Sequence, residues 1–150
     1  MKIYTLKTVQ KLPISLEKAW NFFSSPGNLK TITPDYMGFN IISGSDRLMY
    51  PGQIIQYIVT PVAGIKTKWV TEITHVKDKE YFVDEQRFGP YALWHHKHFL
   101  NEIPGGVEME DIVDNKFHFG VLGQIIHPIL VAPKLKEIFN SRQKKLVELF

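Results

Sequence analysis

The middle of the chain, residues 39–117, is a run of short β-prone segments with turn-forming residues between them and no helical pattern among them. β-branched and aromatic residues fill these segments, as is typical of strands. Six strands are predicted, over 39–44, 53–59, 67–76, 80–88, 92–103 and 107–117. The connecting stretches YPGQ, PVAGI, KDKE, GPY and PGG each favour a turn. Strands that follow one another without a helical crossover indicate an antiparallel meander.

The N-terminal flank predicts one strand and two short helices. Residues 2–10 are rich in β-formers and end before Pro13, which indicates a first strand. Ser15 is placed to cap a short helix that runs through Phe23. In SSPGNLKTITP, we expect Ser25 to cap a second helix with Pro26 at its first position.

The C-terminal flank predicts one long amphipathic helix over 133–150. Its apolar stripe consists of Leu135, Ile138, Phe139, Leu146 and Leu149. The preceding segment, 119–132, is apolar but is interrupted by polar residues and a proline. It has two interpretations, a mobile lid over a cavity entrance or the buried first part of the last helix.

Composition limits the class of protein. A chain of 150 residues with 44% apolar residues is expected to form a single domain, 1–150, with its own core. The absence of cysteine excludes disulfides and thiolate chemistry. The formal charge of +3 is small for a nucleic-acid binder, so no nucleic-acid partner is expected. With no secretory signal and no run of about 18 apolar residues, we expect a cytoplasmic protein without stable membrane insertion.

Together these elements predict an α+β fold. A seven-stranded antiparallel sheet would wrap around the long C-terminal helix, with the two short helices directly after the first strand. A twisted sheet and one helix cannot fill all the space between them, so a cavity is expected there.

The chain resembles the helix-grip superfamily of START domains, polyketide cyclases and birch-pollen-allergen-like proteins, often called SRPBCC, and within it an uncharacterised bacterial ligand-binding branch. The resemblance rests on AWNFFSSPGNLKTITP, YPGQIIQY, FVDEQRFGPYALWHHKHFL and LKEIFNSRQ, which occur in the expected order. It departs from the family pattern at DNKFHFG, where a strand ending in Tyr followed by Pro-Phe-Gly is expected. The resemblance implies a ligand cavity between sheet and helix, while the superfamily also includes carriers, receptors, cyclases and hydrolases.

The stretch WHHKH, residues 94–98, holds half of the six histidines. Alternate residues of a strand share a face. One face therefore carries Trp94, His96 and His98, and the other carries His95 and Lys97. Because the lysine makes the second face the more polar, the first is predicted to point inward, a choice that leaves Phe99 on the outer face unexplained.

The partner strand depends on the length of the turn. If GPY is a three-residue loop, Asp84 lies opposite His96, and Gln86 lies opposite Trp94. A two-residue loop would shift the register and place Asp84 beside His95 on the outer face. We prefer the first register, which gathers Asp84, Gln86, Trp94, His96 and His98 into one patch.

Four interpretations of this patch compete. The His-x-His pair could chelate a metal, but Asp84, His75, His118 and His127, the candidates for a third ligand, lie at no recognisable spacing, so no metal is expected. Asp84 and His96 could act as an acid–base pair in a cyclase- or hydrolase-type enzyme. The patch could instead form the polar wall of a pocket for an apolar ligand, or its histidines could simply be satisfied by neighbours within the sheet.

We favour the pocket, and expect a protein that binds a small hydrophobic molecule for transport or sensing, without a cofactor. The predicted ligand-binding residues are Asp84, Gln86, Trp94, His96, His98 and Arg142. Arg142 lies on or beside the apolar stripe of the last helix and could meet an acidic ligand group or form a surface ion pair. The aromatic residues Trp20, Phe22, Phe23, Trp69, Phe82 and Phe139 are expected to form core.

Overall fold

The computed structural model describes residues 1–60, 66–118 and 120–150. Within them, seven antiparallel strands form one open sheet in the order β1-β7-β6-β5-β4-β3-β2. The strands are β1 (Tyr4–Leu12), β2 (Asn40–Ser43), β3 (Gln53–Val59), β4 (Thr67–Lys77), β5 (Tyr81–Phe88), β6 (Tyr91–Ile103) and β7 (Gly106–Phe117). From β2 to β7 each strand pairs with the next along the chain, and β1 closes against β7. This is the predicted meander.

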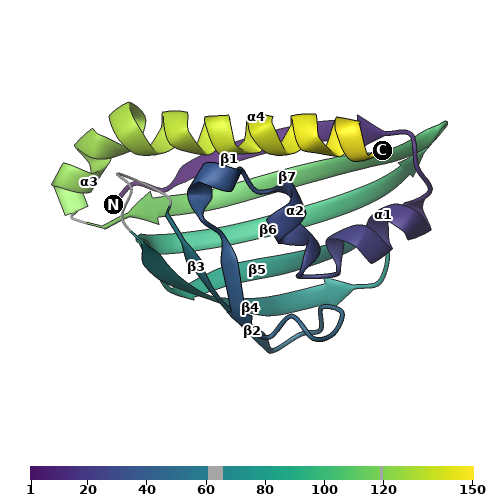
Figure 1. Ribbon diagram of the computed structural model, residues 1–150. Coiled ribbons are helices and arrows are strands. Elements are labelled where there is room, and N and C mark those ends of the chain that lie inside the picture. The colour runs from purple at the N-terminus through teal and green to yellow at the C-terminus, as the bar shows by residue number, and fades with distance from the viewer. Residues whose placement is uncertain (61–65, 119) are drawn as a thin grey trace.

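The helices lie on one face of this sheet. They are α1 (Leu16–Phe23), α2 (Asn28–Ile32), the 3-10 helix η1 (Asp35–Met37), α3 (Gly120–Ile126), the π-helix η2 (His127–Val131) and α4 (Ala132–Leu149). Figure 1 shows α4 running along the sheet, with α1 and α2 on the same side. The predicted fold class, α+β with a helix-grip arrangement, is confirmed. No helix within the described ranges is long and apolar enough to cross a membrane.

The helix after β1 begins as predicted, but the next one does not. Ser15 caps α1 by accepting a hydrogen bond from the backbone N–H of Lys18 at 3.1 Å. The expectation that Ser25 caps α2 is wrong, because its hydroxyl donates back to the carbonyl of Asn21. A turn through Pro26 follows, and α2 begins only at Asn28.

The segment before α4 is helical and ends in the π-helix η2, directly before α4. Proline lacks an N–H and cannot complete the α-helical ladder, so Pro128 accounts for this local widening. His127 is buried there, stacks on Tyr4 and donates a hydrogen bond from Nε2 to Oδ1 of Asn115 in β7. The departure from the family pattern at DNKFHFG therefore supplies the contact that fastens this helix to the sheet.

Most of the segment nevertheless faces outward. Of its apolar residues, Val121, Leu122, Ile125, Ile129 and Leu130 are exposed, whereas Val131 is buried. The segment thus leads into α4 as a helix, but it is not the buried one of the second of our two interpretations. Its mobility as a lid stays a prediction. Phe119 and the predicted turn PVAGI, residues 61–65, lie outside the described residues.

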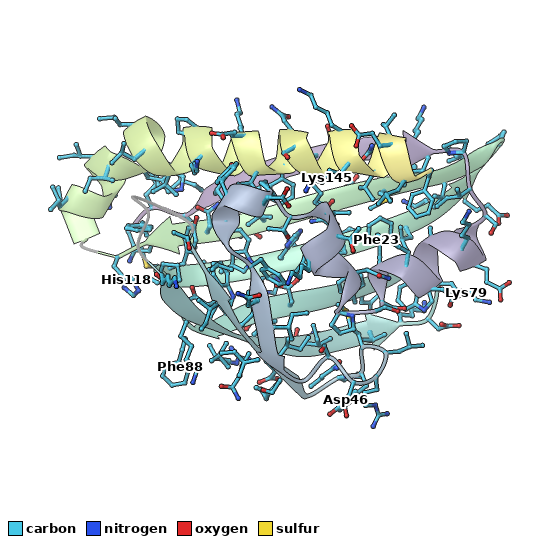
Figure 2. All side chains as sticks on the ribbon, viewed as in Figure 1. Phe23, Asp46, Lys79, Phe88, His118 and Lys145 are labelled. Carbon is cyan, nitrogen blue, oxygen red and sulfur yellow. The ribbon has the colours of Figure 1, made fainter. Side chains whose placement is uncertain are left out.

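The core lies between the sheet and the helices. One cluster of buried residues packs α1 against the ends of β1, β6 and β7, and a second packs α4 against β3 and β4. Figure 2 shows side chains such as Phe23 in this space, whereas Phe88 projects away from the opposite side of the sheet. A cavity remains between the two clusters, over the middle of β5 and β6.

Candidate functional site

The inward face of β6 is the predicted one. Trp94, His96 and His98 all line the cavity. On the outer face, Nδ1 of His95 lies 2.5 Å from Glu85. Phe99, which the sequence left unexplained, packs there against the ring of Tyr81, with 5.9 Å between the ring centroids.

The register of β5 and β6 is also the predicted one. Phe82 lies opposite His98, and Asp84 lies opposite His96. The loop, however, holds only two residues, because Tyr91 already belongs to β6. Gln86 explains the discrepancy, since its side chain accepts from the backbone N–H of Tyr91 at 2.9 Å and donates to its carbonyl at 2.6 Å.

Because of these hydrogen bonds, Gln86 does not belong to the site. Its side-chain amide is used in closing the turn, and Gln86 is not among the residues that line the cavity. The expectation that Gln86 joins the polar patch is therefore wrong. The other predicted members, Asp84, Trp94, His96, His98 and Arg142, do line the cavity.

A residue that sequence reasoning missed completes the patch. Asp111 of β7 lies directly opposite His98 of β6. Its Oδ1 is 2.8 Å from Nε2 of His96 and 3.0 Å from Nδ1 of His98. Asp111 is not itself a lining residue, so it contacts the two imidazoles from the side that faces away from the cavity. The alternation of β7 contained the signal, because Asp111 occupies the inward series of Val107, Met109 and Val113.

The hydrogen bonds connect these groups differently from our expectation. Asp84 bonds to His98, with 2.6 Å between Oδ2 and Nε2, while its closest approach to His96 is 3.8 Å. Asp84 and His96 thus lie within ion-pair distance but are not hydrogen-bonded to each other, and each has another hydrogen-bond partner. Their role as an acid–base pair stays a prediction. The two imidazoles also stack on each other, with ring centroids 3.6 Å apart.

The surroundings of His98 favour its imidazolium form. Both of its ring nitrogens lie within hydrogen-bonding distance of a carboxylate, and only the protonated ring can donate from both. Burial opposes this charge, but the bonds to Asp111 and Asp84 outweigh burial and raise the pKa of His98. His96 behaves in the opposite way, since burial and the charge of His98 lower its pKa. A neutral His96 therefore donates its Nε2–H to Asp111.

The two carboxylates stay ionised in spite of their burial. Burial alone would raise the pKa of Asp84, but the hydrogen bond from His98 is the largest of several effects that lower it. For Asp111 the positive charge of Arg142 is the strongest influence against burial, and its pKa lies well below the usual value. Arg142 thus belongs to the same electrostatic cluster.

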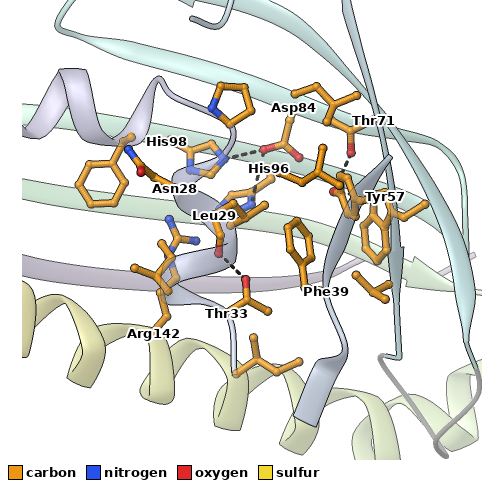
Figure 3. A pocket seen from close by; sticks show the side chains of 18 of the residues that line it. Asn28, Leu29, Thr33, Phe39, Tyr57, Thr71, Asp84, His96, His98 and Arg142 are labelled. Carbon is orange, nitrogen blue, oxygen red and sulfur yellow. Dashed lines mark hydrogen bonds and ion pairs between the residues drawn. The ribbon is translucent and has the colours of Figure 1, made fainter. Parts of the chain in front are cut away.

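Arg142 itself is buried but not paired. Its side chain extends from α4 toward the cluster (Figure 3), and the residue is only 9% exposed. Among the described residues, it forms no hydrogen bond and no ion pair within 4 Å, and its guanidinium lies 5.7 Å from the ring centroid of Phe139. The alternative of a surface ion pair for Arg142 is therefore wrong.

The remainder of the cavity is mostly apolar. It has a volume of about 180 Å³ and is lined by residues of β2 to β6, α1, α2 and α4. Among the aromatic residues expected in the core, all but Trp20 also line it. The aromatic lining residues are Phe22, Phe23, Phe39, Tyr57, Trp69, Phe82, Tyr91, Trp94 and Phe139. The polar cluster therefore forms one wall of an otherwise apolar pocket (Figure 3).

The same cluster includes donors that could in principle hold a metal. One ligand atom each from Asp84, His96 and His98 lies within 4.8 Å of the others. A metal needs unprotonated imidazole nitrogens, however, and His98 directs both of its nitrogens at carboxylates. The arrangement satisfies its own hydrogen bonds and would have to lose them to bind a cation.

Comparisons with known proteins identify the fold. No family model matches the chain, and no curated protein matches its sequence. Solved structures do match: protein CV1439 from Chromobacterium violaceum is 15% identical with a TM-score of 0.73, and covers 97% of this chain and 96% of its own. Protein Ms6760 from Mycobacterium smegmatis is 18% identical with a TM-score of 0.69, over 97% and 89%. Ara h 8.0201 is 14% identical with a TM-score of 0.61, over 98% and 99%.

This chain has the helix-grip fold of Ara h 8.0201. The match extends over nearly the whole of both chains, so the sheet, the short helices after β1 and the long C-terminal helix all correspond. At identities below 20% the likeness is one of architecture. The function has to be argued from the cavity and its side chains.

Proposed function

We propose that this protein binds a small hydrophobic molecule in the cavity between its sheet and α4. The observation that carries the proposal is the cavity itself, about 180 Å³ in volume, with mostly apolar walls and the polar cluster of Asp84, His96, His98 and Arg142 on one side. Ligand sites typically combine apolar walls with a few oriented polar groups. An apolar cavity of about 150 Å³ suffices to bind benzene, so a molecule of one or two rings is of suitable size.

The fold supports the same proposal. Proteins with the birch-pollen-allergen-like helix-grip architecture generally bind hydrophobic ligands. The present cavity lies between the sheet and the C-terminal helix. In this proposal Trp94, His96, His98, Asp84 and Arg142 form the polar wall. Transport or sensing of the ligand, and a cytoplasmic location without a nucleic-acid partner, remain predictions.

The direct test is to identify what the protein carries. The protein is purified without detergent and examined by native mass spectrometry, and bound molecules are extracted and identified. We expect an apolar small molecule at a stoichiometry of up to one per chain.

A binding assay with a neutral fluorescent probe of two rings, 1-aminonaphthalene, tests the cavity independently of any retained ligand. Leu29→Trp places a large ring into the lining and is expected to weaken binding about tenfold or more. Val147→Trp is the matched control, because Val147 is 66% exposed on α4 and lies outside the lining. Equal binding by both variants would locate the probe elsewhere and refute the proposed site.

A further inference from the structure

The outer face of α3 and η2 exposes a group of large apolar side chains. Five of the ten residues from 121 to 130 are of this kind, and each is between 55% and 74% exposed. Single exposed apolar residues are ordinary on a protein surface, but a group of them along one helical segment indicates an interaction site. We call these five residues the apolar patch: Val121, Leu122, Ile125, Ile129 and Leu130.

Contacts on the opposite side of the same segment fix this orientation. Gly123 is buried, and a side chain at its position would clash with the backbone that follows β7. The hydroxyl of Tyr4 donates to the backbone carbonyl of Gln124 at 3.1 Å. The ring of His127 is hydrogen-bonded to Asn115 of β7. The apolar patch cannot turn toward the sheet without the loss of these contacts.

The chain that contains the patch is positively charged. Residues 115–136 include no aspartate and no glutamate, but they include Lys116, Lys134 and Lys136. Lys136 is exposed in the second turn of α4. The next acidic residue along the chain, Glu137, is paired with Lys134, with 3.6 Å between Oε2 and Nζ.

Lys2 adds a cation from the N-terminus. Its Nζ lies 4.8 Å from the ring centroid of Tyr4, and this ring stacks on His127 of η2 with 3.7 Å between the centroids. The first acidic residue of the chain, Glu17, belongs to α1, and Figure 1 shows α1 and α3 at opposite ends of the molecule. The apolar patch therefore lies in a basic region of the surface.

An apolar helical face beside lysines fits the surface of a membrane that contains anionic lipids. Such a face lies in the plane of the interface, with its apolar side chains at the boundary of head groups and acyl chains and its cations near the lipid phosphates. A second copy of the chain fits less well. Symmetric pairing of two identical patches would bring the same lysines toward each other, and like charges across an interface are unfavourable.

We infer that the apolar patch binds peripherally to membranes that contain anionic lipids, with Lys2 and Lys136 close to the lipid phosphates. None of the five patch residues lines the cavity, so the inference concerns a second surface and goes beyond the proposed function. The contact is one of a helix on a membrane surface, with no crossing of the bilayer.

Sedimentation with vesicles tests the apolar contribution. The full chain is mixed with vesicles of phosphatidylcholine and phosphatidylglycerol in a ratio of about two to one, or of phosphatidylcholine alone, and should bind mainly to the mixed vesicles. Ile125→Gln combined with Ile129→Gln should lower the partition coefficient about tenfold. Val147→Gln combined with Leu149→Gln, at exposed positions near the far end of α4, is the matched control and should leave the coefficient unchanged.

A second pair of variants tests the charges. Lys2→Gln combined with Lys136→Gln should lower the partition coefficient for the mixed vesicles about tenfold or more. Lys11→Gln combined with Lys18→Gln removes the same number of charges from exposed positions of β1 and α1 and is the matched control. This control should have a much smaller effect, because the overall charge of the protein changes equally in both variants.

A fluorescent label shows which residues touch the lipid. The chain contains no cysteine, so Leu122→Cys creates a single site for an environment-sensitive nitrobenzoxadiazole label. Its emission should move to shorter wavelength when mixed vesicles are added. The same label at Val147→Cys, which is also exposed, should not respond.

Three results would overturn the inference. The first is the absence of binding to the mixed vesicles. The second is equal binding by Ile125→Gln with Ile129→Gln and by its control, which would leave only unspecific adsorption through charge. The third is a dimer in sedimentation equilibrium that these two substitutions convert to a monomer, which would show that a second copy covers the patch. Circular dichroism of every variant checks that the loss of binding does not reflect a loss of folding.

Discussion

His98 and Asp111 face each other across β6 and β7, and 3.0 Å separates Nδ1 of the imidazole from Oδ1 of the carboxylate. Asp111 also holds His96, so one carboxylate fixes both imidazoles that line the cavity. Asp84 reaches His98 from the other neighbouring strand. The polar wall is thus assembled from three adjacent strands, and its charges are set by contacts that a ligand need not make.

Asp111→Asn is expected to destabilise the fold strongly. It removes the negative charge shared by the two histidines and leaves the imidazolium of His98 with one anionic partner instead of two. Breaking a buried ion pair by removing one partner typically costs about 3–5 kcal/mol. The free energy of unfolding, measured by urea denaturation, should fall by an amount in this range.

Asp114→Asn is the control for that experiment. Asp114 lies on the outer face of the same strand, where it pairs with Lys97 at 3.2 Å and remains partly exposed. Exposed pairs contribute about 1 kcal/mol or less. A comparable loss of stability in both variants would show that Asp111 is not specially coupled to the histidines.

The charge of His98 makes stability depend on pH. Its pKa is raised in the folded protein, so the stabilisation is fully present below the unfolded pKa of about 6.5 and is lost as pH rises through the folded pKa. The lowered pKa of His96 affects stability on the acid side instead. As pH falls below about 6.5, the unfolded chain takes up the proton of His96 before the folded protein does, and this lowers the free energy of unfolding. We therefore expect the free energy of unfolding to decrease on the alkaline side of pH 6.5.

His98→Asn should abolish this alkaline decrease while retaining a polar side chain. Nitrogen-15 NMR of the wild-type protein at pH 7 should show two protonated ring nitrogens on His98, and one, Nε2, on His96. A neutral His98 at pH 7, or an unchanged pH profile in the variant, would contradict the assignment.

The alternation within strands allowed much of this site to be predicted. Period two placed His96 and His98 inside and His95 outside, and the turn placed Asp84 opposite His96. These features are local, because they depend on one hairpin. To predict the role of Asp111, the register between β6 and β7 would have been needed. An acidic residue would also have had to be placed on the inner face of a strand whose inner positions are otherwise mostly apolar. The alternation of the strand placed Asp111 on the inner face, but the sequence did not show that it contacts His96 and His98.

The failures have the same physical origin. Gln86 lies on the predicted face, yet its amide bonds to the backbone of Tyr91 in a turn shorter than expected. Ser25 has the composition of a cap, but its hydroxyl finds an earlier carbonyl of α1. Polar side chains choose among several nearby partners of similar energy, so their hydrogen bonds are less predictable than the burial of apolar positions.

Gln86→Ala is expected to weaken folding but not ligand binding. The substitution leaves the N–H and carbonyl of Tyr91, a residue only 4% exposed, without their side-chain partner. Each lost hydrogen bond costs about 1 kcal/mol, so a loss of about 2 kcal/mol is expected in chemical denaturation. The affinity for 1-aminonaphthalene should be unchanged at temperatures where both proteins are folded. A large loss of affinity in the folded variant would show that Gln86 contributes to the binding site after all.

The cluster of Asp84, His96 and His98 is expected to bind no metal at stoichiometric level. A divalent cation would have to displace the proton that His98 donates to Asp84, and it would lie close to the guanidinium charge of Arg142. Elemental analysis of protein purified without chelators should therefore find well under one equivalent of zinc, iron, manganese or nickel. Titration with zinc followed by NMR should likewise leave the His96 and His98 ring signals in place. One equivalent of metal in the wild-type protein that disappears in His98→Asn would establish a metal site. In that case Asp84, His96 and His98 would be metal ligands and not a hydrogen-bonded cluster.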